Sequence, residues 1–164
     1  LIQIAANGGA KAVLDADGDA FMDGLRQKPF MIKPNRDEAE HLLGEVFESK
    51  ADVARAALKL SEMGVELVVI SLGKQGAIAC YQGTVYDASA PEVKSVSTIG
   101  SGDSMIAGML YALERNAGIE DALRLGCAAG AATAMSDGAD IGEKTDVDAL
   151  VSQVKVKKLE FSPA

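Results

Sequence analysis

The stretch Glu66-Leu-Val-Val-Ile-Ser71 carries the strongest strand pattern in the sequence. Its four central residues are all apolar, and three of them are β-branched. A continuous apolar run of this length is typical of a parallel strand that is covered on both faces of a sheet. The stretch therefore predicts the buried centre of an α/β fold.

Strand and helix patterns alternate on both sides of this central strand. Upstream, strand patterns lie at 11–15 and 30–33, and helical patterns at 20–25, 35–43 and 51–63. Downstream, strand patterns lie at 76–81 and 84–86, and helical patterns at 102–115, 119–135 and 145–154. The two downstream strands are joined across Gln82-Gly83 and are expected to form a hairpin. This order predicts a mainly parallel sheet with helices on both faces and an antiparallel hairpin extension.

Composition limits the classes of function. The chain has 164 residues, 48% of them apolar and 24% charged, which is typical of one globular domain. The net charge of −8 disfavours nucleic-acid binding. No apolar run reaches the roughly 18–20 residues that span a bilayer, so no membrane association is expected. Cys80 and Cys127 are far apart in apolar segments, and we interpret them as reduced core residues of a cytoplasmic protein.

The segment before the helix expected at 102–115 is rich in glycine. Gly100 and Gly102 allow a ligand to approach the main chain closely. The start of the helix offers unpaired N–H groups and the positive end of its dipole, which together favour an anion. Asp103 is stabilised there as a carboxylate and could accept a proton from an alcohol. The same pattern is equally typical of a turn in which Ser101 or Asp103 caps the helix, and the local residues leave both interpretations open.

Two other loops follow expected strands. Ser71-Leu-Gly-Lys-Gln-Gly76 is a Gly-x-x-Gly loop that suits a nucleotide phosphate or ribose, although a plain turn into the hairpin fits equally well. Asn35 and Glu38 could hold magnesium through oxygen ligands. Their spacing favours the alternative, which is an N-cap and its capping box at the start of the helix at 35–43.

Several familiar sites are not supported. Asp15-Ala-Asp-Gly-Asp19 resembles a calcium loop, but Ala20 and Arg26 stand where an EF-hand needs Gly and Glu. His41 is the only histidine and lies in an acidic helix, which argues against a serine hydrolase. Neither a Walker loop nor a Rossmann pattern occurs. The small residues at 126–133 favour close helix packing and could also leave room for a flat ring.

Taken in order, three of these segments resemble motifs of the ribokinase-like (PfkB-type) sugar kinases. Ser97-Thr-Ile-Gly-Ser-Gly-Asp103 resembles the second signature of that family, usually Asp-Thr-x-Gly-Ala-Gly-Asp. Lys33-Pro-Asn-Arg-Asp-Glu38 resembles its Asn-x-x-Glu motif, and the segment from Ser71 to Gly76 resembles its nucleotide loop. The segment at 13–21 and Gly-Asp-Ser-Met105 are similar to the sugar-phosphate branch, which contains the phosphofructokinases and tagatose-6-phosphate kinases.

The resemblance implies a role for each matching residue. Asp103 would be the base for the sugar hydroxyl, and the amides from Gly100 through Ser101 and Gly102 to Asp103 would form the anion hole. Asn35 and Glu38 would lie near Mg²⁺ and the phosphates of ATP.

Other matching residues would line the nucleotide and cation sites. Those implied to contact the nucleotide are Ser71, Gly73, Gly76 and Ser95, with Cys127 and Ala131 as walls of the adenine pocket. A monovalent cation, K⁺, would bind through loops at Ser97, Ile99 and Gly138. Ser97 and Ser101 depart from the usual Asp and Ala of the signature, and the first departure weakens the expectation of a cation.

The resemblance covers only the carboxyl-terminal half of such kinases. The chain begins at Leu1 inside an expected helix, so we expect residues 1–164 to be the nucleotide-binding and catalytic-base half of a single kinase domain. The half that binds the sugar and carries the lid would be missing, and the isolated fragment is expected to be inactive. The implied reaction is ATP-dependent phosphorylation of a sugar or sugar-phosphate hydroxyl, and a ketohexose phosphate is the favoured substrate. The full-length enzyme could form a homodimer. A kinase of another alcohol, such as ribose, a nucleoside or a vitamin, and a non-catalytic nucleotide-binding module remain alternatives.

Overall fold

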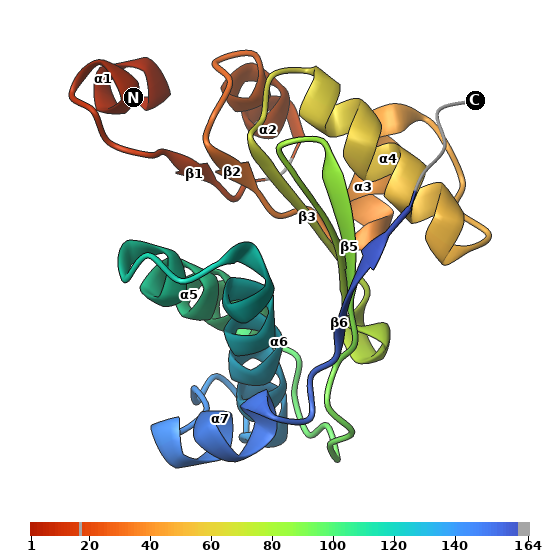
Figure 1. Cartoon of the computed structure of the whole chain (residues 1–164), viewed down its shortest axis with the longest axis vertical. Helices are drawn as coiled ribbons and strands as arrows, with labels where there is room; N and C mark the ends of the chain where they lie inside the picture. The colour runs from red at the N-terminus through yellow and green to blue at the C-terminus, as the bar shows by residue number, and fades with distance from the viewer. Residues whose placement is uncertain (17, 161–164) are drawn as a thin grey trace. The chain divides into compact units, whose positions relative to one another are not determined.

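The computed structural model describes residues 1–16 and 18–160 (Figure 1). The helices are α1 (Ile2–Asn7), α2 (Gly18–Leu25), α3 (Arg36–Leu43), α4 (Lys50–Glu62), α5 (Ser101–Glu114), α6 (Ile119–Met135) and α7 (Lys144–Val151). The strands are β1 (Val13–Leu14), β2 (Met31–Ile32), β3 (Leu67–Ser71), β4 (Ala77–Tyr81), β5 (Thr84–Ala88) and β6 (Val156–Leu159). Within the described residues, no helix is both long enough and apolar enough to cross a bilayer.

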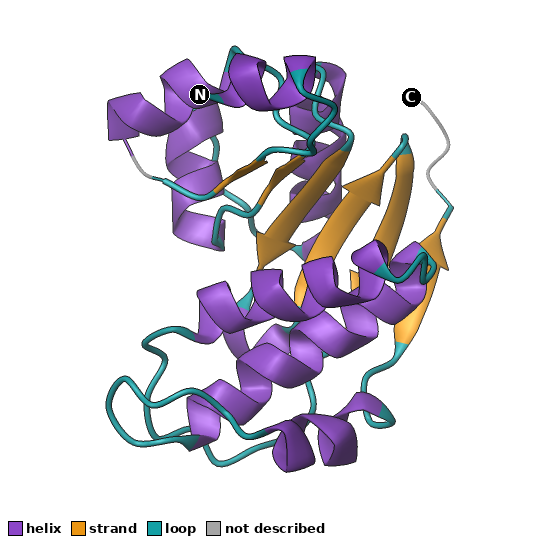
Figure 2. Cartoon of the chain, turned by 90° about the vertical axis from the view of Figure 1, so that its left-hand side faces the viewer, coloured by secondary structure: helices purple, strands orange, loops and turns teal. Residues whose placement is uncertain are grey.

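The strands, orange in Figure 2, form one mixed sheet. Their order in the sheet is β1-β2-β3-β4-β5-β6. β1, β2 and β3 run parallel, with Val13 opposite Met31 and Met31 opposite Leu67. β4 and β5 are joined by Gln82 and Gly83, whose φ angles of 49° and 78° are both positive. A two-residue loop with two positive φ angles is the turn that matches the twist of an antiparallel hairpin. The predicted α/β fold with a hairpin extension is therefore confirmed.

The last strand, β6, was not predicted. The sequence pattern indicated a helix at 145–154, whereas α7 ends at Val151 and the chain then extends into β6. β6 has only four residues, and both Lys157 and Lys158 are exposed. β6 lies at the end of the strand order, and short edge strands with lysines are a common way to prevent pairing with other chains. Such a strand carries too little apolar alternation to be recognised.

The chain folds into two compact units. One contains Leu1–Leu72 and Ile78–Tyr86, with the segment from Lys158 onward. The other contains Gly73–Ala77 and Asp87–Lys157. We call them the strand-rich unit and the helical unit.

The core of the strand-rich unit is built on β3. All four residues of β3 from Leu67 to Ile70 are fully buried, as the apolar run predicted. The largest side chains of the cluster around this strand are Phe21, Leu25, Ile32, Phe47, Leu60, Ile70 and Ile78. Cys80 lies in the same cluster, and burial raises the pKa of its thiol, so it stays protonated and unreactive. Neither Cys80 nor Cys127 forms a disulfide, as expected.

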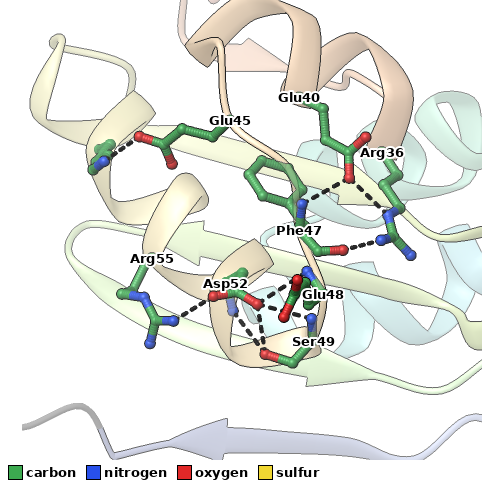
Figure 3. Close-up of polar contacts among 9 residues, drawn as sticks. Arg36, Glu40, Glu45, Phe47, Glu48, Ser49, Asp52 and Arg55 are labelled. Atoms are coloured by element: carbon green, nitrogen blue, oxygen red, sulfur yellow. Dashed lines mark hydrogen bonds and ion pairs between the residues drawn. The ribbon is translucent and has the colours of Figure 1, made fainter.

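The loop between α3 and α4 is held by charged side chains (Figure 3). The Glu40 carboxylate accepts hydrogen bonds from the Phe47 amide at 2.8 Å and from the Arg36 side chain at 3.1 Å. Arg36 also donates to the carbonyl of Phe47. These contacts place the Phe47 ring in the core, where it is 1% exposed. The charge of Glu40 therefore supports the packing of an apolar side chain.

Glu40 should make the stability of this unit depend on acid pH. The Phe47 amide and the Arg36 side chain lower the pKa of Glu40 below its ordinary 4.5. A lowered folded-state pKa adds stability above the ordinary pKa, and this stability is lost as pH falls through the folded-state value. We expect Glu40→Gln to lower the Tm at pH 7 and to lose that difference as the pH falls below the lowered pKa of Glu40. Thermal unfolding against pH measures this.

Asp37→Asn is the matched control for Glu40→Gln. It removes a carboxylate from the same helix, and the Asp37 side chain makes no hydrogen bond or ion pair within the described ranges. Its Tm should follow that of the parent protein across the pH range. A Glu40→Gln variant whose Tm deficit stays the same from pH 7 down to the acid end of the stability curve would contradict the role given to the charge.

The helical unit is held together by close contact between α5 and α6, with α7 packed on α6 (Figure 1). A Cβ at Gly126 would lie 2.5 Å from the Met109 side chain, and one at Gly130 would lie 3.0 Å from the Ser101 carbonyl oxygen. The small residues at 126–133 therefore allow the two helices to approach, which confirms the packing interpretation.

Candidate functional site

In the strand-rich unit, candidate residues gather at the carboxyl ends of the parallel strands. Asp15 follows β1, Lys33 follows β2, and Ser71 ends β3. Because β1, β2 and β3 are parallel, these ends share one edge of the sheet, where α/β proteins place ligands. Asn35 forms a parallel bridge with Ser71, so these two predicted site residues lie side by side.

Asn35 and Glu38 form the capping box that their spacing predicted. The Asn35 side-chain oxygen accepts from the Glu38 amide at 2.9 Å, and the Glu38 carboxylate accepts from the Asn35 amide at 2.8 Å. Both side chains are exposed, and the capping contacts use one oxygen of each. In the part of the chain that the structure describes, no group of three or more His, Cys, Asp or Glu could hold a metal ion. A magnesium ion here would therefore depend on water and phosphate oxygens for most of its ligands.

Lys33 is a buried charge that the sequence analysis did not single out. It is 6% exposed, and its ammonium lies 3.8 Å from the Asp15 carboxylate. The sequence did show that Lys33 is a charged residue between an apolar strand and Pro34, which could have drawn attention to it. Only the packing shows that the Lys33 side chain is buried. Asp17, the third residue of the rejected calcium-like loop, lies outside the described residues.

The loop after β3 is shaped by its two glycines, which both belong to the helical unit. Gly73 begins a short 3₁₀ turn, Gly73–Gln75, and is exposed with a φ of 55°. Gly76 is buried with a φ of 93°, and a Cβ there would lie 1.9 Å from the carbonyl oxygen of Ala88. Gly76 is thus required by the close approach of two main-chain segments, whatever ligand the loop holds.

The glycine-rich segment opens α5 with an uncapped first turn. Gly100 has a φ of 75° and is the N-cap, and no side chain makes a capping hydrogen bond. Across the described residues, the amides of Gly102 and Asp103 donate to no protein group. Asp103 is exposed in this turn. The structure therefore has free N–H donors, the positive end of a helix dipole and a carboxylate within four consecutive residues.

Ser101 adds a further unpartnered group to this turn. Its Oγ is buried and is the only buried side-chain N or O atom in the described ranges without a hydrogen-bond partner. The sequence analysis noted the departure from Ala but predicted no consequence for it. In the structure, the Ser101 hydroxyl makes no hydrogen bond to any of the described residues.

The three residues predicted to bind a monovalent cation lie close together. Ser97 Oγ donates to the Gly138 carbonyl at 2.8 Å and accepts from the Ile99 amide at 3.2 Å. The Ser97 side chain therefore already occupies one lone pair of a carbonyl assigned to the cation. A cation would have to share that oxygen, so the residues fit such a site only in part.

The remaining predicted residues of the helical unit lie on α6 and in the segment before α5. Cys127 and Ala131 are buried, at 4% and 8% exposure. Ser95 is half-buried. Their placement on the wall of an adenine pocket, or against a nucleotide, stays a prediction.

Comparison with known proteins identifies the family that this chain matches. The pfkB family of carbohydrate kinases matches residues 1–146. The chain is 36% identical over 150 residues to 1-phosphofructokinase of Bacillus subtilis, covering 92% of this chain and 49% of that protein.

Solved structures agree with this match. Phosphofructokinase-2 of Escherichia coli, in complex with potassium, has a TM-score of 0.87 and 32% identity, over 92% of this chain and 50% of that one. Ribokinase of Arabidopsis thaliana, complexed with ribose and ATP, has a TM-score of 0.80 and 26% identity, over 92% and 51%. The chain thus spans about half the length of the curated relatives it matches. It belongs to the pfkB family of carbohydrate kinases.

Proposed function

We propose that the protein carrying this chain transfers the γ-phosphoryl group of ATP to a hydroxyl of a sugar phosphate, with a ketohexose phosphate as the substrate class. Membership of a carbohydrate kinase family supports the reaction class. The relative named 1-phosphofructokinase supports a phosphorylated ketohexose as acceptor. Residues 1–164 would supply the nucleotide-binding and catalytic-base half of the kinase domain.

The observation that carries this proposal is the uncapped first turn of α5. The Asp103 carboxylate is exposed there and would accept the proton of the attacking hydroxyl. The free amides of Gly102 and Asp103 would stabilise the negative charge that builds on the transferred phosphoryl group. Base and anion hole would thus come from one rigid helix start.

ATP and Mg²⁺ fit the remaining candidate residues in this proposal. Asn35 and Glu38 would hold the metal through water near the phosphates, because their capping contacts leave one oxygen of the Glu38 carboxylate free. The residues assigned to the nucleotide are Ser71, Gly73, Gly76, Ser95, Cys127 and Ala131. A solved relative contains potassium, and Ser97, Ile99 and Gly138 are the residues that would hold it here.

The isolated chain is not expected to turn over substrate. Phosphoryl transfer depends on holding the acceptor in line and excluding water from the phosphates. The chain spans about half the length of its relatives, and we assign the sugar-binding groups and the lid to the other half.

A substrate panel on the full-length protein tests the proposal. ATP consumption should be fastest with a ketohexose phosphate and slower with ribose, nucleosides and vitamin alcohols. A preference for a nucleoside over every hexose phosphate would refute the proposed substrate class. ATP binding without turnover of any alcohol would support a nucleotide-binding module instead.

Asn35→Ala tests whether Asn35, the N-cap of α3, also helps to bind Mg²⁺ and the phosphates of ATP. Loss of the cap should lower stability by about 1 kcal/mol. If Asn35 also lies near Mg²⁺ and the phosphates, the variant should require more Mg²⁺ for half-maximal activity. Titration of activity with Mg²⁺ at saturating ATP measures this.

Ser49→Ala is the matched control for Asn35→Ala. Ser49 caps α4 with the same type of capping box, formed with Asp52. It should cost a similar amount of stability and leave the Mg²⁺ requirement unchanged. Equal Mg²⁺ titrations for the two variants would restrict Asn35 to a structural role.

A further inference from the structure

A buried hydroxyl on α6 lies directly behind the first turn of α5. Thr133 is 2% exposed and belongs to none of the predicted sites. Its Oγ1 donates to Ser104 Oγ at 2.7 Å and accepts from the Gly142 amide at 3.0 Å. One side chain thus joins α6, the first turn of α5 and the segment that follows α6.

These bonds reach the residue next to the proposed base. Ser104 follows Asp103 in the chain, and its amide donates to the Gly100 carbonyl at 2.9 Å. The methyl group of Thr133 also faces Gly100, where a Cβ would lie 3.8 Å from Thr133 Cγ2. Thr133 therefore contacts the helix start through its hydroxyl, and its methyl group lies near the glycine-rich turn.

A second set of contacts holds the other end of the same turn. The amides of Val96 and Ser97 both donate to the Ala134 carbonyl, at 2.7 and 3.3 Å. Ser97 Oγ bonds to the Gly138 carbonyl at 2.8 Å. The turn from Ser97 to Ser104 is therefore attached to the end of α6 and to the segment after it at both of its ends.

The Thr133 bonds are the less exposed part of this attachment. Ser97 is only half-buried, so water can compete for its bond, whereas Thr133 is almost completely shielded. Removing the Thr133 hydroxyl leaves the Ser104 hydroxyl and the Gly142 amide without a part-buried partner, which costs more than the loss of an exposed hydrogen bond. Among these contacts, loss of the Thr133 hydrogen bonds should therefore disturb the start of α5 most.

We propose that Thr133 is a positioning residue for phosphoryl transfer, which fixes the first turn of α5 so that Asp103 and the free amides keep their mutual geometry. The inference rests on the proposed function of Asp103. It gives Thr133 no contact with the substrate, and its action goes through Ser104 and Gly142.

The test uses Thr133→Val and Thr133→Ser in the full-length protein, because valine keeps the shape and serine keeps the hydroxyl. Thr133→Val removes both hydrogen bonds of the hydroxyl and should lower kcat by about tenfold. Its KM for ATP should change by less than about threefold, since Thr133 is not among the residues assigned to the nucleotide. Thr133→Ser should keep kcat within about twofold of the parent enzyme.

A double-mutant cycle with Ser104→Ala tests the route of the effect. If the Thr133–Ser104 bond carries it, Ser104→Ala should lose activity too, and the double variant should lose little more than Thr133→Val alone. Full additivity would overturn the proposed route.

Hydrogen exchange gives a readout that does not need activity. Peptides covering the turn at 97–105 should exchange faster in Thr133→Val than in the parent or in Thr133→Ser. Unchanged exchange there, or a kcat for Thr133→Val within about twofold of the parent, would overturn the inference. Full activity of an Asp103→Asn variant would instead overturn the proposed role of Asp103 as the base, so the two failures are distinguishable.

Discussion

Asp103→Asn is expected to lower kcat by about 10²–10⁴-fold in the full-length protein, with affinity for ATP almost unchanged. Asparagine has nearly the shape of aspartate but cannot accept the proton of the attacking hydroxyl. The Asp103 side chain is exposed and makes no hydrogen bond or ion pair to the described protein, so the substitution should not disturb the fold. Steady-state kinetics and a separate ATP-binding titration measure the two parts of the result.

Asp146→Asn is the matched control for Asp103→Asn. Asp146 lies in the first turn of α7, which also lacks a side-chain cap, so its replacement changes charge at a helix start in the same way. It should leave kcat within about twofold of the parent. If Asp103→Asn behaved like Asp146→Asn, Asp103 would not be the base, and the helix start would act through its amides alone.

Gly76→Ala is expected to destabilise the fold by roughly 2–5 kcal/mol, combining left-handed strain with forced overpacking. The φ of 93° is unfavourable for any residue with a side chain. The added Cβ would also lie 1.9 Å from the Ala88 carbonyl oxygen and 2.7 Å from the Ala90 amide nitrogen. These are main-chain atoms, so no side chain can rotate away. Chemical denaturation measures the loss.

Gly73→Ala separates the clash from the strain. Gly73 has a φ of 55°, but a Cβ there would meet nothing within 4 Å. This variant should lose only about 1–2 kcal/mol, the cost of the left-handed conformation. Equal losses for the two variants would show that the segment at 88–90 can move, and would remove the structural reason given for Gly76.

The sequence predicted those elements whose pattern is local. The apolar run of β3, the capping residues Asn35 and Glu38, and the turn at Gln82 each specify a conformation within a few residues. β6 was missed because an edge strand is stabilised by its neighbour in the sheet, while its own residues include exposed lysines. The sheet partner of such a strand cannot be read from four residues.

In the candidate site, too, the sequence identified the residues whose role is local and missed those whose role depends on packing. The glycines and the carboxylate of the α5 start could be named from the sequence, because a helix start with free amides is a local feature. Lys33 and Thr133 were not identified, since an exposed lysine and a helical threonine look the same in sequence as buried ones.

By itself, the sequence determined the order of strands and helices from β1 to α7, the capping of α3, and the glycine-rich turn that carries Asp103. Only the tertiary structure decided that Gly76 is fixed by a main-chain segment 12 residues away at Ala88, and that Thr133 joins α5 to Gly142. The physical reason is the separation along the chain between the residues that interact. Backbone conformation and capping depend on neighbours in the chain, whereas burial and hydrogen-bond partners depend on residues that meet only when the helices and strands pack.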